Sequence, residues 1–244
     1  MTAARPDQFR ISGTFNFRDV GGARTTGGAT VREGILLRSA QLSRLDDTGR
    51  DTLLGLGVTD VHDLRGPAEI DFIGHDALPG AVRLHITPFD AAMGETPPHE
   101  ARRHSSAHGH MLEVYREFPA KPEAHAAIKR LAGSMLGGTA LVHCAAGKDR
   151  TGWAVATLLR AVDVLEDDIY ADYLLSNDAV PTLRAFMTAD MNEELSDDLL
   201  GVKPEYLAAA TTSMQDMYGG IDGYLAEIGI TPEDRAALRV RLLD

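Results

Sequence analysis

One cysteine and one arginine, six positions apart, carry the strongest chemical signal in this sequence. Cys144 and Arg150 lie in the segment 143–152, which reads His-Cys-Ala-Ala-Gly-Lys-Asp-Arg-Thr-Gly. The apolar run 139–142 before it is typical of a buried strand, and residues 153–160 after it are typical of a helix. A loop between a strand and a helix N-terminus can turn its backbone N–H groups toward one point, at the positive end of the helix dipole. The segment therefore predicts an oxyanion site, and phosphate is the commonest ligand of such a site.

The side chains around this loop predict covalent catalysis through sulfur. The thiol of Cys144, near a helix N-terminus and a guanidinium, is expected to ionise readily, and a thiolate attacks without a separate base. Arg150 can bind two phosphate oxygens through its planar fork. We expect Thr151 to donate a hydrogen bond to the sulfur and His143 to hold the loop from behind. The combination predicts phosphoryl transfer to sulfur, followed by hydrolysis of the thiophosphate.

Other interpretations of the segment fit less well. A buried structural cysteine would not need the glycine, lysine and arginine that follow it. A Walker A loop would need a glycine in place of Val142 and a serine or threonine in place of Asp149. A sulfur-transfer loop stays open as an alternative, although it does not need an arginine at this spacing.

The segment resembles the Cys-x5-Arg signature of the protein tyrosine phosphatase superfamily, in the form found in a bacterial branch of it. Residues 16–22, Asn-Phe-Arg-Asp-Val-Gly-Gly, are similar to the N-terminal motif of that branch, and residues 63–65, Asp-Leu-Arg, to a second one. Residues 205–207 and 218–225 resemble its C-terminal helices. The resemblance spans nearly the whole chain, but only the loop motif is specific enough to stand alone. It implies an α/β fold of the tyrosine phosphatase type: a central, mostly parallel sheet of about four strands flanked by helices, with extra C-terminal helices.

The resemblance also implies roles for the loop residues. Phosphate binding is expected from Ala145, Ala146, Gly147, Lys148, Asp149 and Arg150. The bacterial branch carries its proton donor as an aspartate inside the signature, which Asp149 matches; Asp63 and Asp90 are the alternatives. A cation at the position of Lys148 also resembles phosphoinositide phosphatases, where it can contact a second phosphate.

We therefore expect a cysteine-dependent phosphatase that hydrolyses phosphotyrosine through a cysteinyl-phosphate intermediate. Phosphoserine, phosphothreonine and phosphoinositides are further candidate substrates. A dedicated phosphoinositide phosphatase is the first alternative, and an inactive phosphate-binding module is the second. No metal and no cofactor are expected.

Composition bounds the remaining possibilities. A chain of 244 residues with 44% hydrophobic residues can build one α/β core, so we expect a single domain over residues 1–244. A single cysteine excludes an internal disulfide. The first residues have no apolar signal region and no apolar run could span a bilayer, so a cytoplasmic location is the default, with secretion without a cleaved signal as the other option. The sequence does not indicate an oligomeric state.

The net charge of −12 is unevenly distributed. Residues 1–150 hold 18 basic and 18 acidic side chains, whereas residues 151–244 hold 6 basic and 18 acidic ones. This helical, acidic C-terminal portion argues against a nucleic-acid partner. Attraction of an anionic substrate is then expected from local cations: Arg18, Arg38, Arg65, Lys148 and Arg150.

Hydrophobic periodicity places the motifs on secondary structure. We expect strands over 35–39, 58–65, 81–89 and 139–142. Helices are expected over 46–56, 123–136, 153–160 and 163–175, from residue 204 onward and from 231 to about 243, with a solvated acidic connection over 190–198. Asp63 and Arg65 would lie at the carboxyl end of a strand, where ligands bind in open α/β sheets, or would form a structural pair. Arg18 and Asp19 either support the phosphate loop or form a surface ion pair.

Residues 91–110 show no clear periodicity. The segment 91–118 follows a strand, which makes it a candidate lid over Cys144. His104 and His108 have helical spacing suited to a metal, but no carboxylate or cysteine completes the set, and a solvated, mobile segment is the favoured interpretation.

Overall fold

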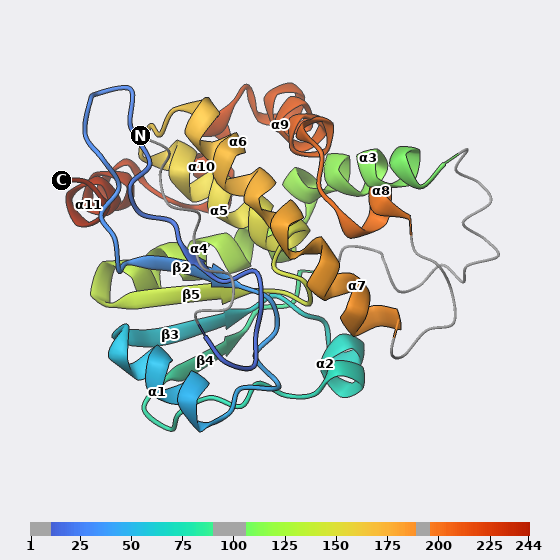
Figure 1. Ribbon diagram of the computed structural model, residues 1–244. Helices are drawn as coiled ribbons and strands as arrows, with labels where there is room; N and C mark the ends of the chain where they lie inside the picture. The colour runs from blue at the N-terminus through green and yellow to red at the C-terminus, as the bar shows by residue number, and fades with distance from the viewer. Residues whose placement is uncertain (1–10, 90–105, 189–195) are drawn as a thin grey trace, which may run out of the picture.

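The computed structural model describes residues 11–89, 106–188 and 196–244 (Figure 1). Its sheet contains five strands in the order β1-β2-β5-β3-β4, with β1 antiparallel to β2 and the others parallel. The strands are β1 Arg18–Asp19, β2 Leu36–Ser39, β3 Val58–Asp63, β4 Arg83–Ile86 and β5 Thr139–His143. This confirms the mostly parallel α/β sheet. Strand β1 was missed because two residues are too short to show a hydrophobic period.

Helices flank the sheet and fill the C-terminal half of the chain. They are α1 Asp47–Gly55, α2 Pro67–Ile73, α3 Ala107–Glu117, α4 Pro122–Gly137, α5 Asp149–Ala161, α6 Glu166–Leu174, α7 Val180–Thr188, α8 Asp197–Leu200, α9 Pro204–Tyr218, α10 Ile221–Ile228 and α11 Pro232–Leu242. Two 3₁₀ turns, Phe118–Ala120 and Leu175–Ala179, join α3 to α4 and α6 to α7. Helix α8 begins at Asp197, inside the expected acidic connection 190–198, and continues to Leu200, whose side chain is buried in the core.

Alternate side chains of the central strand enter two separate apolar layers. Ala140 and Val142 of β5 face the larger layer, which is covered by α4 and α5, whereas Leu141 faces a smaller layer closed by α1. Figure 1 shows α4 and α5 above the strands and α1 below them. This two-sided burial explains why β5 is an uninterrupted apolar run, as expected of a central parallel strand.

Helix α5 lies inside the larger layer. Every residue from Asp149 to Ala161 is buried, and α5 is contacted by α4, α6, α9 and α10. Trp153 of α5, Tyr206 of α9 and Tyr224 of α10 belong to the same apolar cluster as Val142. The acidic C-terminal helices thus surround the helix that follows the cysteine loop, and their apolar faces fix its position.

The carboxyl ends of the parallel strands β2, β3, β4 and β5 lie side by side at one edge of the sheet. Ser39 pairs in register with His143, His143 with Asp63, and Asp63 with Ile86. Cys144 follows His143 directly, so the loop opens at this edge of the sheet. Ligands bind at this edge in open α/β sheets.

The described part of the expected lid, residues 106–118, belongs to the core. Helix α3 contacts α9, with Met111, Val114 and Tyr115 buried, and His108 is half-buried against Tyr206. The expectation of a solvated, mobile segment over 91–110 was wrong for residues 107–110, which form the first turn of α3. The apolar side chains that follow at 111, 114 and 115 form a helical face that packs against α9 and so hold this turn in place. His104 and residues 91–105 lie outside the described residues. Among the described helices, none has the length and hydropathy needed to cross a membrane.

Candidate active site

The loop that follows β5 turns sharply at Gly147. Gly147 has a φ of +67°, and a Cβ added there would lie 2.1 Å from the carbonyl oxygen of Ser39. Only glycine fits this position, because its left-handed conformation and its contact with β2 both exclude a side chain. Cys144 is 3% exposed at the start of the loop, and α5 begins at Asp149.

The carbonyl groups of the loop are held from outside by three residues. Asn16 donates through Nδ2 to the carbonyl oxygens of residues 146 and 147, at 2.9 and 3.0 Å. Arg38 donates through Nη2 to the Gly147 oxygen at 2.8 Å, and the Gln41 amide donates to the residue 145 oxygen at 3.1 Å. The N–H and C=O groups of one trans peptide point in opposite directions, so carbonyls bound on the outside are expected to turn the amides of the same peptides toward the inside. Such an arrangement would suit an anion.

A buried ion network fixes Asn16 and Arg38 in turn. Asp172 of α6 accepts from Arg18 at 2.7 Å and from Arg38 at 2.5 Å, and Arg18 also donates to Asn16 Oδ1 at 2.6 Å. Burial, followed by the charge of Arg38, lowers the pKa of Arg18 to about 10, against the opposing effect of Asp172.

Three arginines expected to attract substrate are not available to it. Arg18, Arg38 and Arg65 are all at most 2% exposed and paired with carboxylates. The prediction that they attract substrate was wrong, because buried charges are stable only when paired and so present no free field at the surface. Arg18 and Arg38 instead brace the loop.

Arg150 is oriented by a carboxylate that sequence reasoning missed. Its Nη1 and Nη2 atoms donate to the two oxygens of Glu69 at 2.6 and 2.5 Å, and Nη1 also donates to the Leu64 carbonyl at 3.2 Å. Burial favours the neutral guanidine, but the hydrogen bonds that Arg150 donates to Glu69, followed by the charge interactions with Cys144 and Glu69, outweigh it and raise the pKa of Arg150. Glu69 lies on α2, which begins with Gly66 at the N-cap, Pro67 at N1 and Glu69 at N3. This start signature could have predicted the helix.

Asp149 lies between a lysine and a tyrosine. Its Oδ2 is 2.8 Å from Lys148 Nζ, and its Oδ1 accepts a hydrogen bond of 2.7 Å from the Tyr115 hydroxyl. Lys148 Nζ also donates to the carbonyl oxygens of Leu199, at 2.8 Å, and Gly201, at 3.3 Å. The lysine is 4% exposed, so in this structure its ammonium binds the loop after α8.

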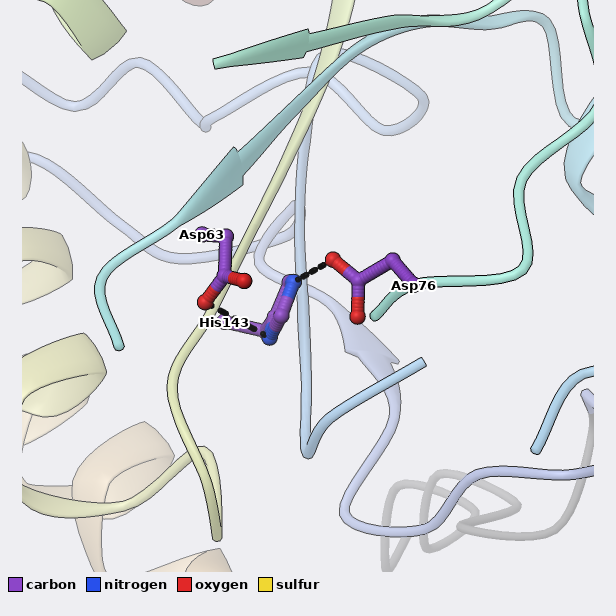
Figure 2. Close-up of side chains that lie close together, drawn as sticks. All are labelled: Asp63, Asp76 and His143. Carbon is purple, nitrogen blue, oxygen red and sulfur yellow. Dashed lines mark hydrogen bonds and ion pairs between the residues drawn. The ribbon is translucent and has the colours of Figure 1, made fainter. Parts of the chain in front are cut away.

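A second buried network surrounds His143, the residue before Cys144 in the sequence (Figure 2). His143 lies between Asp76, whose Oδ2 is 2.7 Å from Nε2, and Asp63, whose Oδ1 is 3.8 Å from Nδ1. Arg65 contacts Asp63 at 2.7 Å and Asp76 at 2.8 Å, and His143 Nδ1 is 3.1 Å from the Cys144 carbonyl oxygen. Burial lowers the pKa of His143, but the charges of Asp76 and then Asp63 dominate and raise it above its ordinary value.

This cluster does not suit a metal ion, although its ligand atoms lie within 4.8 Å of one another. Arg65 is already paired with both carboxylates, and a cation would have to displace its guanidinium from a fully buried position. The expectation that Asp63 and Arg65 form a structural pair agrees with these contacts. Asp63 has both oxygens bound to Arg65 and is not placed to donate a proton to substrate.

The remaining expected residues are placed as follows. Thr151 Oγ1 is buried and has no hydrogen-bond partner among the described residues, so the expected bond to sulfur is not formed. The side chain is β-branched and lies in the first turn of α5, where few rotamers are allowed. Asp19 accepts from the amides of Gly21 and Gly34 and so holds the turn after β1. Asp90 lies outside the described residues.

Known proteins are similar to most of this chain. Residues 9–244 match the model of the tyrosine phosphatase family. The chain belongs to the tyrosine phosphatase family. It is 37% identical to the triple specificity protein phosphatase PtpB of Mycobacterium tuberculosis, over 91% of this chain and 94% of that protein. It is 29% identical to a tyrosine-protein phosphatase of Nostoc commune, over 84% of this chain and 73% of that protein.

The family assignment agrees with the resemblance found in the loop, and this family member is a protein-tyrosine phosphatase. Among solved structures, TpbA of P. aeruginosa aligns with a TM-score of 0.38 at 16% identity, covering 82% of this chain and 90% of that one.

Proposed function

We propose that the chain hydrolyses phosphotyrosine through a cysteinyl-phosphate intermediate. The observation that carries the proposal is the anchored loop, which begins at Cys144 and whose carbonyl oxygens at residues 146 and 147 are bound by Asn16 and Arg38. Since the N–H and C=O of one trans peptide point in opposite directions, we expect the amides of these peptides to point into the loop. An anion placed in this loop would bring its phosphorus to the sulfur of the cysteine. Preorganised donors around a transferring phosphoryl group are the main source of catalysis in such reactions.

Arg150 would bind the phosphoryl group side-on. Glu69 occupies the end-on fork of the guanidinium, formed by Nη1 and Nη2. The donors that remain on the adjacent edge are Nε and the second hydrogen of Nη2, which can meet two phosphate oxygens. Glu69 would therefore fix the plane in which Arg150 presents that edge.

Each step balances in atoms and charge. The Cys144 thiolate forms an S–P bond as the ester P–O bond breaks, and Asp149 gives its proton to the departing phenolic oxygen. A water molecule then attacks phosphorus, gives a proton to Asp149 and releases phosphate with the thiolate restored. Lys148 and Tyr115 are in place to stabilise the Asp149 carboxylate after it has donated its proton.

The proposal is tested by phosphate release from phosphotyrosine, phosphoserine and phosphoinositide substrates in parallel. We expect the highest kcat/KM with phosphotyrosine and a loss of roughly 10⁴-fold or more in Cys144→Ser. Because Cys144 is the only cysteine in the chain, alkylation by iodoacetate should inactivate the enzyme at a single site, and phosphate should protect it. Turnover that survives in Cys144→Ser, or alkylation without loss of activity, would refute the proposal.

Phosphoinositide hydrolysis depends on Lys148. For a second phosphate to bind there, Nζ must leave the carbonyls of Leu199 and Gly201. We propose that phosphoinositides are secondary substrates, and that Lys148→Ala lowers their hydrolysis more than that of phosphotyrosine. Lys203→Ala, which removes a lysine 41% exposed and paired with Asp198, is the matched control. An equal effect of Lys148→Ala on both substrates would contradict this role.

A further inference from the structure

Two buried tyrosine hydroxyls lead in a chain to Asp149. Tyr115 of α3 and Tyr173 of α6 are at most 1% exposed, and their hydroxyl oxygens are 2.7 Å apart. The Tyr115 hydroxyl is also 2.7 Å from Asp149 Oδ1. The two tyrosines are 58 positions apart in the sequence and come from different helices.

The direction of the chain follows from counting hydrogens. A hydroxyl carries one hydrogen, and Tyr115 donates its own to Asp149. Tyr173 must therefore supply the hydrogen between the two hydroxyl oxygens. Burial, followed by the charge of Asp149, raises the pKa of Tyr115 well above its ordinary value, so the hydroxyl stays protonated and remains a donor.

We propose that Tyr115, polarised by Tyr173, is a positioning residue that orients the carboxyl group of Asp149 and stabilises the carboxylate left after proton transfer. In the carboxylate form, Oδ1 accepts the Tyr115 hydrogen and Oδ2 lies beside Lys148 Nζ, so both oxygens are held. The proposal rests on the proposed function of Asp149 as proton donor.

Tyr115 stabilises the transition state more than the ground state. A hydrogen bond from a hydroxyl to a carboxylate is stronger than one to a neutral carboxyl group, and charge develops on Asp149 only as its proton leaves. Tyr115 therefore contributes most when the leaving group needs that proton. A phenol such as that of tyrosine needs it, whereas 2,4-dinitrophenolate leaves without it.

The test compares these two leaving groups in the full chain. In Tyr115→Phe we expect kcat/KM to fall about 10- to 100-fold with phosphotyrosine and less than about threefold with 2,4-dinitrophenyl phosphate. The ring is retained, so its packing against Phe118 and Tyr206 is kept. Tyr224→Phe is the matched control: it removes another buried hydroxyl, which contacts Trp153 Nε1 at 3.3 Å, and should leave both rates unchanged.

A double-mutant cycle separates positioning from packing. Tyr173→Phe alone should lower only the phosphotyrosine rate, by a few-fold, and should add nothing in the Tyr115→Phe background. If Tyr115→Phe does not fold, as judged by thermal melting, Tyr173→Phe carries the same comparison. Equal losses on both substrates, or no loss on either, would overturn the role of Tyr115. A wild-type chain that turns over neither substrate would instead overturn the proposed function.

Discussion

Changing Asn16 to aspartate would test whether the outer hydrogen bonds hold the phosphate loop in shape. The substitution replaces one NH₂ group by an oxygen at nearly constant size. Oδ1 would keep its 2.6 Å contact with Arg18, and the φ of +52° at this position is one that aspartate tolerates as asparagine does. The two donations from Nδ2 to the carbonyls of residues 146 and 147 would be lost.

The size of the effect follows from those two bonds. Each intramolecular hydrogen bond contributes about 0.5–1.5 kcal/mol net, so their loss costs about 1–3 kcal/mol of unfolding free energy. The new oxygen would also face two carbonyl oxygens, which places the expected loss toward the upper end. Because the same bonds orient the loop amides, we expect kcat/KM with phosphotyrosine to fall by about 10- to 100-fold, at about 1.4 kcal/mol for each factor of ten.

Urea unfolding and steady-state kinetics measure the two effects. Asn177→Asp is the control, because it loses a single donation, to the Val202 carbonyl at 3.0 Å, and contacts no loop carbonyl. It should lose about 0.5–1.5 kcal/mol and keep most of its activity. If Asn16→Asp loses stability like the control but keeps full activity, the loop amides are oriented by something other than Asn16, and the account of the loop is refuted.

Two further substitutions address the loop and the network behind it. Gly147→Ala should lower kcat/KM by at least about 100-fold, because the new Cβ would lie 2.1 Å from the Ser39 carbonyl oxygen and the φ of +67° disfavours alanine. Gly133→Ala, which has open space around its Cβ, is the control and should stay fully active. Comparable rates for the two variants would contradict this prediction. Asp76→Asn should lower the unfolding free energy by about 3–5 kcal/mol at pH 5.5, since it removes the buried carboxylate that pairs with both His143 and Arg65. The pKa of His143 is raised in the folded state, so the His143–Asp76 pair stabilises the fold fully below the unfolded pKa of about 6.5 and loses its contribution as pH rises through the folded pKa. The difference in unfolding free energy between wild type and Asp76→Asn should therefore be smaller at pH 9 than at pH 5.5. A difference that stays constant would show that His143 carries no charge.

The sequence by itself determined the local parts of this protein. The strand, loop and helix around Cys144 are contiguous, so hydrophobic period and spacing predicted them, and α5 begins at Asp149, within the predicted loop. The start of α11 was equally local, because Thr231 and Asp234 cap it reciprocally. Such signals depend on residues that are close in the sequence, so they do not depend on the tertiary structure around them.

Only the tertiary structure decided which charges are partners. Asn16 reaches the loop across 130 residues, and Glu69 reaches Arg150 across 81. Nothing in the sequence shows that Glu69 pairs with Arg150 or that Asp76 pairs with His143. These ion pairs form because the tertiary structure brings distant segments together at one edge of the sheet. The same holds for Arg18 and Arg38: whether an arginine attracts substrate or braces a loop depends on its burial, and burial is a property of packing rather than of residue type.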